Sequence, residues 1–273
     1  MKNERNDWKY YNYRNAWRFA GPPHEEQKLN DEACKNLLRM SGLMVRNTYD
    51  FDCKEETCFW NLIKDQFGGL KELTSNTRNR VTKSLECLDF QRVDFSMVQT
   101  LGYPILKATF DDYATVDRPM NQQIFEDYLR HCQCWDYEYW GVFDKNTNEF
   151  IGFCANRLWE NATEYGIIGI WPQYKHNGTF PYYGLFYEMN RYYLQEKSFR
   201  YVTDGSRSIT EHSNIQQFLE EKFRFRKAYC QLAVHYKWWM KIAVNSLYPF
   251  RKIITLPRVK AILNMEAMQR GEK

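Results

Sequence analysis

The sequence predicts an α/β (α+β) protein with a mixed central sheet flanked by helices. From residue 90 onward, strand and helix periodicities follow in the order strand, two helices, three strands, helix, strand, helix, strand. Strands connected through helices pair in parallel, so part of this sheet is expected to be parallel. A hydrophobic content of 44%, with 17% aromatic residues, is ample for a buried core.

The first 89 residues are expected to form a smaller, partial α/β extension. Asn30 is suited to cap a helix, and two glycines at 68 and 69 precede a basic helix. The expected elements are a tyrosine-rich lead-in, a helix, two strands and the basic helix: residues 1–15, 31–39, 43–51, 57–64 and 75–88.

Residues 90–238 are expected to form the main domain. Asp117, Arg118 and Pro119 separate its first two helices, and the polar stretch 145–148 favours a hairpin turn. The expected elements up to the end of the hairpin are strand 90–95, helices 96–114 and 120–131, and strands 137–144 and 149–158.

The stretch from Thr163 to Tyr236 organises this domain. A short apolar strand leads into a polar loop, and Pro181 then suits a first helical turn, with Thr179 as its cap. The expected elements are strand 163–171, loop 172–180, helix 181–196, strand 201–204, turn 205–208, helix 214–222 and strand 229–238. Residues 239–273 are expected to form a C-terminal helical tail.

Charge and cysteine usage limit the classes of function. With 38 basic and 34 acidic residues, the net charge of +4 is too small to predict nucleic-acid binding by itself. The eight cysteines include no CxxC pair, which predicts reduced thiols and no metal site. The N-terminus is polar, unlike a signal peptide, and no apolar run approaches the roughly 18 residues that span a bilayer. We therefore expect a cytoplasmic protein, soluble or peripheral on the inner membrane face.

Several short stretches resemble the GNAT superfamily of acyltransferases. The hairpin WGVFDKNTNEFIGFC (140–154) resembles the family's central strands, and EEKFRF (220–225) resembles its closing YEKxGF motif. SNTRNRVTKS (75–84) and FRYVTDGSRS (199–208) look closer to the Fem-type (FemAB-like) branch, which comprises peptidyl and aminoacyl transferases. The resemblance covers residues 90–238 and, loosely, the first 89. It implies transfer of an acyl group to an amine of a sugar, an amino acid or a cell-envelope precursor.

The resemblance implies acyl-CoA or aminoacyl-tRNA as the donor, with tRNA as a partner if the chain is Fem-like, and no metal. GNAT members hold the CoA pyrophosphate with an R/Q-x-x-G-x-G/A loop. Here the corresponding stretch QYKHNGT (173–179) has a single glycine. Glu220 replaces the family's tyrosine acid, and Arg224 replaces the glycine of its GF pair. These departures weigh against CoA and fit aminoacyl-tRNA, but they leave the donor open.

In the resembled fold, the acyl donor enters where strands 163–171 and 201–204 diverge. Gly166 or Gly169 marks a bulge that frees backbone N–H groups for the donor carbonyl, or both glycines merely ease packing beneath Trp171. The donor's phosphates are assigned to the loop, although solvation is the simpler alternative for its histidine. The assigned loop residues are Lys175, His176, Gly178 and Thr179.

Asp204 ends a strand where open α/β sheets usually bind ligands. We assign it a role as base or in orienting the amine, with Glu164 as the second carboxylate. The alternative is a turn aspartate that caps Ser206 or Arg207. The residues assigned to substrate binding are Arg78, Arg80, Lys83, Arg207 and Asn214, and a solvated helix face is the alternative for the first three.

The tail begins with an apolar stretch, WWMKIAVNSLYPF (238–250), followed by Arg251 and Lys252. It is expected to pack on the sheet or, alternatively, to contact a membrane surface between Trp238 and Lys252. Either way we expect the two tryptophans to be covered. The second functional hypothesis is a catalytically silent GNAT-like binding module, docked to a membrane or a protein partner through the basic helix and the tail.

Overall fold

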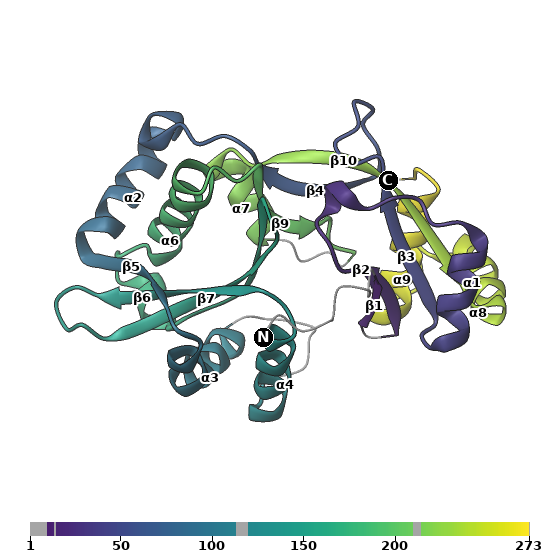
Figure 1. Cartoon of the computed structure of the whole chain (residues 1–273), viewed down its shortest axis with the longest axis horizontal. Coiled ribbons are helices and arrows are strands. Elements are labelled where there is room, and N and C mark those ends of the chain that lie inside the picture. Colours follow the sequence, from purple (N-terminus) through teal and green to yellow (C-terminus); the bar gives the residue numbers. More distant parts are fainter. Residues whose placement is uncertain (1–9, 14, 113–119, 210–213, 273) are drawn as a thin grey trace. The chain divides into compact units, whose positions relative to one another are not determined.

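The computed structural model describes residues 10–13, 15–112, 120–209 and 214–272. The chain forms two compact units, each assembled from separate stretches of sequence (Figure 1). Unit 1 comprises Met1–Leu62, Ser206–Asn214 and Lys227–Lys273, and unit 2 comprises Ile63–Gly205 and Ile215–Arg226. We expected domain boundaries at residues 89 and 238, and these differ from the bounds of the two units. The expected division into domains stays a prediction. Ala114 and the linker 117–119 lie outside the described residues, as does most of the lead-in 1–15.

Unit 2 contains five strands of a mixed sheet. They are β5 (Leu88–Val93), β6 (Tyr137–Asp144), β7 (Phe150–Leu158), β8 (Ala162–Ile170) and β9 (Tyr201–Ser206), in the order β9-β8-β7-β6-β5. Neighbouring strands are antiparallel except β8 and β9, which are parallel because helices connect them. The turn between β6 and β7 forms because the Asp144 carboxylate accepts the N–H groups of Asn146 and Thr147. The predicted mixed sheet is confirmed.

Helices cover both faces of this sheet (Figure 1). One face carries α2 (Ser75–Cys87), α6 (Pro181–Asn190) and α7 (Asn214–Phe223), and the other carries α3 (Phe95–Asp111) and α4 (Gln122–Gln133). The fully buried Phe186 of α6 packs against Phe218 and Phe223 of α7, with ring centroids 6.0 Å apart in both pairs. Apolar residues of α3, α4 and β7 close the opposite face: Val98, Leu106, Phe125 and Phe153.

The segment between β8 and β9 differs most from its prediction. Part of the expected loop is a short helix, α5 (Pro172–His176), and the expected long helix is α6 followed by a π-helical turn, Arg191–Glu196. Pro181 occupies the first turn of α6 as predicted, but Thr179 as its cap was wrong. The cap position belongs to Phe180, whose backbone is left-handed with φ of +52°. The Thr179 hydroxyl is engaged within the preceding loop instead.

Unit 1 is built from both ends of the chain. Its strands are β1 (Tyr10–Tyr13), β2 (Ala16–Phe19), β3 (Met44–Tyr49), β4 (Phe59–Lys64) and β10 (Arg226–Tyr236), in the order β1-β2-β3-β10-β4. We expected strand 229–238 to close the main domain, but it belongs to unit 1. β10 lies between β3 and β4, where Cys230, Leu232 and Val234 complete the core of this unit.

The helices of unit 1 are α1 (Asp31–Met40), α8 (Trp238–Leu247) and α9 (Pro257–Gln269), with helical turns at Pro23–Glu25 and Tyr248–Phe250. A further turn, Gly69–Glu72, precedes α2 in unit 2. Asn30 caps α1 as predicted, because its Oδ1 accepts the N–H of Ala33 at 2.8 Å. The tail is helical as expected, and Met240, Val244 and Leu263 join the core of this unit.

Candidate active site

The parallel strands β8 and β9 diverge at the predicted position. Their pairing runs from Ala162–Tyr201 to Glu164–Thr203 and ends there, although both strands continue. Asp204 is the first residue of β9 after the last pair. The strands therefore separate beside this carboxylate.

The surroundings of Asp204 favour its protonated form. The side chain is half-buried, faces the negative charge of Glu164 and is hydrogen-bonded to Gln216 of α7. Burial, and then the charge of Glu164, raises the pKa of the Asp204 carboxyl to about 8, while the bond to Gln216 acts in the opposite direction. A carboxyl group with a pKa near neutral pH can both accept and donate a proton during catalysis.

The predicted end of the strand at Asp204 and the predicted turn from residue 205 were wrong, because β9 continues through Gly205 to Ser206. The N–H of Gly205 donates to Thr203 Oγ1 at 3.0 Å, and its φ of +80° suits glycine. A Cβ at Gly205 would lie 2.9 Å from Glu164 Oε1, so glycine also leaves room for that carboxylate. Arg207 donates to the Cys58 carbonyl at 2.6 Å. These contacts hold residues 205–207 through groups other than the Asp204 carboxylate.

The raised pKa of Asp204 predicts a pH-dependent stability. Between about pH 4 and pH 8 the folded chain holds a proton that the unfolded chain releases, so the wild-type free energy of unfolding falls as pH rises. The slope is at most about 1.4 kcal/mol per pH unit. Asp204→Asn lacks this titration. Urea unfolding should therefore show the variant gaining stability relative to wild type across that window, and a pH-independent difference would contradict the raised pKa.

Strand β8 carries the bulge expected at one of its two glycines. The register of β7 with β8 shifts across residues 154–156, and Gly166 lies opposite this shift. A Cβ at Gly166 would lie 2.3 Å from the Ala155 carbonyl oxygen, so the two strands approach too closely for a side chain. Gly169 is regularly paired, and a Cβ there would press on the Phe153 ring at 3.0 Å. The bulge interpretation thus fits Gly166 and the packing interpretation fits Gly169.

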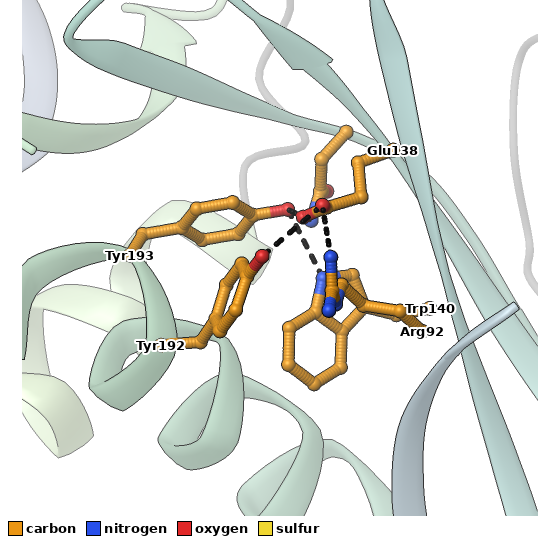
Figure 2. A network of polar contacts seen from close by, with 6 residues as sticks. Arg92, Glu138, Trp140, Tyr192 and Tyr193 are labelled. Atoms are coloured by element: carbon orange, nitrogen blue, oxygen red, sulfur yellow. Dashed lines mark hydrogen bonds and ion pairs between the residues drawn. The ribbon is translucent and has the colours of Figure 1, made fainter. Parts of the chain in front are cut away.

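A line of polar side chains links β7, β6 and the π-helical turn, and Figure 2 shows the part of it around Glu138. The Cys154 thiol donates to Asn156 Oδ1 at 2.9 Å, and Asn156 Nδ2 donates to the Tyr193 hydroxyl at 3.3 Å. Trp140 Nε1 donates to the same hydroxyl at 3.0 Å. Tyr193 in turn donates to Glu138 Oε2 at 2.7 Å. The buried Tyr193 hydroxyl therefore joins three neighbours.

The outer end of this polar line is a charged pair beside a groove. Arg92 donates to Glu138 Oε1 at 3.3 Å, and its guanidinium lies 4.9 Å from the centre of the Tyr192 ring (Figure 2). The groove has a volume of about 430 Å³. It is lined by Arg92, Val93, Asp94, Phe95, Tyr137, Glu138 and Tyr139.

The inner end of the polar line meets the candidate site. Burial and the negative charge of Asp204 raise the pKa of the Cys154 thiol, against a backbone hydrogen bond from Gly166. The bulge, Asp204 and the polar line are thus neighbours. The sequence analysis missed the polar line. One feature of the sequence points to it. Glu138 and Trp140 are two residues apart in strand 137–144, so their side chains lie on the same face of the sheet.

The loop predicted to bind phosphates is largely engaged in its own contacts. The Thr179 hydroxyl donates to Asn177 Oδ1 at 2.7 Å, and Gly178 has φ of +82°. Lys175 forms an ion pair with Asp112 at 2.8 Å, with His176 also near Asp112. Trp171 donates its N–H to the Ile151 carbonyl at 3.0 Å and precedes α5.

Of the three basic residues of α2, only Arg80 reaches this loop. Arg80 Nη1 donates to the Tyr183 hydroxyl at 2.7 Å, and its guanidinium lies 5.2 Å from the centre of the Phe180 ring at the start of α6. Arg78 instead donates to the carbonyls of Leu70 and Leu73.

The remaining assigned residues are not brought to the start of α6. Lys83 is exposed and pairs with Glu86 at 3.7 Å. Arg207 and Asn214 belong to unit 1, and the side chain of Asn214 lies outside the described part of the chain. Within the described residues, no three His, Cys, Asp or Glu side chains are grouped so as to hold a metal ion, and no helix has the length and apolarity to cross a bilayer.

Comparison with solved structures finds the same fold in FemX. The two structures superpose with a TM-score of 0.50 at 10% sequence identity, over 74% of this chain and 67% of FemX. At this identity the likeness establishes the fold alone. The predicted resemblance to GNAT and Fem-type proteins is thereby confirmed at the level of the fold.

Two further structures are more distant. L-PGS from Bacillus licheniformis gives a TM-score of 0.46 at 11% identity, over 89% of this chain and 71% of that protein. PaiA N-acetyltransferase from Thermoplasma acidophilum, in complex with coenzyme A, gives a TM-score of 0.30 at 16% identity, over 41% of this chain and 74% of that one. No family model and no curated protein matches the sequence.

Proposed function

We propose that this chain is an N-acyltransferase or aminoacyltransferase that moves an acyl group from an activated ester or thioester to an amine. The observation that carries the proposal is Asp204, a carboxyl group with a pKa of about 8 at the point where β8 and β9 separate. The bulge at Gly166 supports it, because it interrupts the regular pairing of β8 close to the same position. The fold shared with FemX is consistent with this chemistry.

In the proposed reaction the amine nitrogen attacks the donor's carbonyl carbon and forms the new C–N bond. The bond from that carbon to the donor's oxygen or sulfur breaks, and the leaving group takes a proton. Asp204, in its ionised form, accepts the proton that the amine loses. Glu164 raises the basicity of Asp204 through its negative charge. In this proposal, a backbone N–H of β8 beyond the end of its pairing with β9 polarises the donor carbonyl.

The donor's phosphate is proposed to bind at the start of α6, beside Arg80. Phe180 provides no side-chain cap there, Pro181 has no N–H, and the N–H of Tyr183 donates to the Phe180 carbonyl at 2.9 Å. This leaves few N–H groups for a pyrophosphate but one guanidinium for a single phosphate. The arrangement favours aminoacyl-tRNA over acyl-CoA. The acceptor is proposed to be an amine of an amino acid, an amino sugar or a cell-envelope precursor.

A transfer assay with both donors tests this function. The native chain is incubated with labelled aminoacyl-tRNA or with acetyl-CoA, each with a mixture of amino acids and amino sugars, and amide formation is measured. We expect turnover with aminoacyl-tRNA and no low-micromolar binding of acetyl-CoA by calorimetry. Tight acetyl-CoA binding with acetyl transfer would make it an ordinary acetyltransferase. Absence of turnover with either donor would favour the alternative of a catalytically silent binding module.

The same assay tests the phosphate contact through a matched pair of variants. Arg80→Gln should raise the KM for the donor about tenfold or more with little change in kcat, because a hydrogen bond to a charged group contributes about 1.5–3 kcal/mol. Lys83→Gln removes a positive charge from the same helix, at an exposed position that pairs with Glu86, and should leave KM unchanged. Equal effects of the two variants would assign the contribution to general charge and not to Arg80.

A further inference from the structure

Exposed apolar side chains are concentrated in one short stretch of the C-terminal tail. Nine large apolar side chains are exposed in the described chain, and seven of them fall between residues 238 and 256. They are Trp238, Trp239, Ile242, Leu247, Phe250, Ile253 and Leu256, here called the tail face. The exposed fraction reaches 76% for Trp238 and 75% for Ile253. Isolated exposed apolar residues are ordinary, but a concentration of this kind marks an interaction surface.

The tail is anchored to unit 1 by a separate, narrow stripe. Met240, Val244 and Tyr248 are buried at four-residue intervals and join the core of this unit with Leu263 and Met265. The expectation that the tail packs back on the sheet is therefore correct for this stripe. It was wrong for the two tryptophans, which are exposed.

The charge of the same stretch is entirely positive. Residues 237–260 contain six basic residues and no Asp or Glu: Lys237, Lys241, Arg251, Lys252, Arg258 and Lys260. Two acidic residues of the following helix and C-terminus are already in ion pairs, Glu266 with Arg270 and Glu272 with Arg251. The whole chain has a net charge of only +4, so this stretch is locally far more basic than the protein.

We propose that the tail face binds the surface of an anionic lipid bilayer, with α8 lying in the headgroup region. Tryptophan prefers the membrane interface, and basic residues interspersed with exposed apolar ones attract anionic headgroups. A second copy of this chain is a poorer occupant, because a two-fold interface through this face would bring two sets of cations together. The proposal is independent of the acyl donor. It would hold the enzyme next to acceptors that are part of a membrane.

Co-sedimentation with lipid vesicles tests the proposal on the full chain. Vesicles of about one-third phosphatidylglycerol in phosphatidylcholine should bind the chain, and vesicles of pure phosphatidylcholine should bind it at least tenfold more weakly. Binding should weaken as salt is raised, because exposed charges are screened. Absence of binding to the anionic vesicles, or equal binding to both, would overturn the proposal.

Two pairs of substitutions test the apolar and the basic residues of the tail separately. Trp238→Ser with Trp239→Ser should weaken binding at least tenfold, and Lys241→Gln with Lys252→Gln should weaken binding to anionic vesicles by a similar factor. Met40→Ser removes an equally exposed apolar side chain from α1 of the same unit and should have no effect. Thermal unfolding should be unchanged in all three. A chain that sediments as a dimer, and becomes monomeric in the tryptophan variant, would assign the tail face to self-association and overturn the proposal.

Discussion

Replacing Asp204 with asparagine should lower kcat by about 10²–10⁴-fold, the usual contribution of a positioned proton acceptor. Asparagine keeps the size of the side chain and can bond to Gln216, but it cannot take a proton. In the wild type, activity should rise with pH up to about 8, because the ionised carboxylate is the active form and the pKa of Asp204 is raised to that value. The measurement is a pH–rate profile for both proteins with the donor that gives turnover.

Glu164→Gln is the matched control for this prediction. It removes the neighbouring negative charge and keeps Asp204, so the midpoint of the profile should move below about pH 8 while turnover persists at high pH. An Asp204→Asn variant that keeps full turnover would remove Asp204 from the mechanism. An unchanged midpoint in Glu164→Gln would show that burial alone sets the pKa.

Replacing Tyr193 with phenylalanine should destabilise the fold by about 1–3 kcal/mol, the cost of leaving a buried polar group without a partner. The side chain is 1% exposed, and its hydroxyl is the acceptor for Trp140 Nε1 at 3.0 Å. Glu138 keeps Arg92 and Tyr192 when this hydroxyl is lost, so the indole N–H of Trp140 bears most of the cost. Urea unfolding of the purified variant measures the change.

Tyr192→Phe provides the comparison for Tyr193→Phe. Its hydroxyl meets Glu138 at 3.4 Å, a longer contact than the 2.7 Å bond of Tyr193. We therefore expect a loss below about 1 kcal/mol. Equal losses for the two variants would show that the polar line contributes nothing beyond the removal of a tyrosine hydroxyl.

Local pattern and chemistry were enough to predict most elements of the fold. Periodicity separated helices from strands, Asn30 marked the start of α1, and the composition of 145–148 marked a turn. The divergence of β8 and β9 beside Asp204 also followed from the element order and the resemblance. These features depend on residues close in sequence, or on an arrangement that many chains share.

Features that depend on distant residues escaped the sequence analysis. The sequence of strand 229–238 does not indicate that β10 pairs with β3. The pairing depends on the residues of both strands, which are far apart in the sequence. The polar line joins Arg92, Glu138 and Tyr193 from three separate elements, and each alone suggests a surface charge or an apolar helix face. The exposure of Trp238 also contradicted the expectation that this side chain packs on the sheet.

The discontinuous build of unit 1 has a consequence during synthesis on the ribosome. All residues of unit 2 have been translated by Arg226, so this unit can fold while the chain is still growing. The N-terminal strands of unit 1 are made first but must wait for β10, the strand that lies between β3 and β4. Until β10 has been made, β3 and β4 each have an unpaired edge that can pair with a wrong strand. We therefore expect the N-terminal residues of the nascent chain to need protection by chaperones for longer than the rest. A chain truncated after residue 226 should contain a folded unit 2 and an incomplete unit 1.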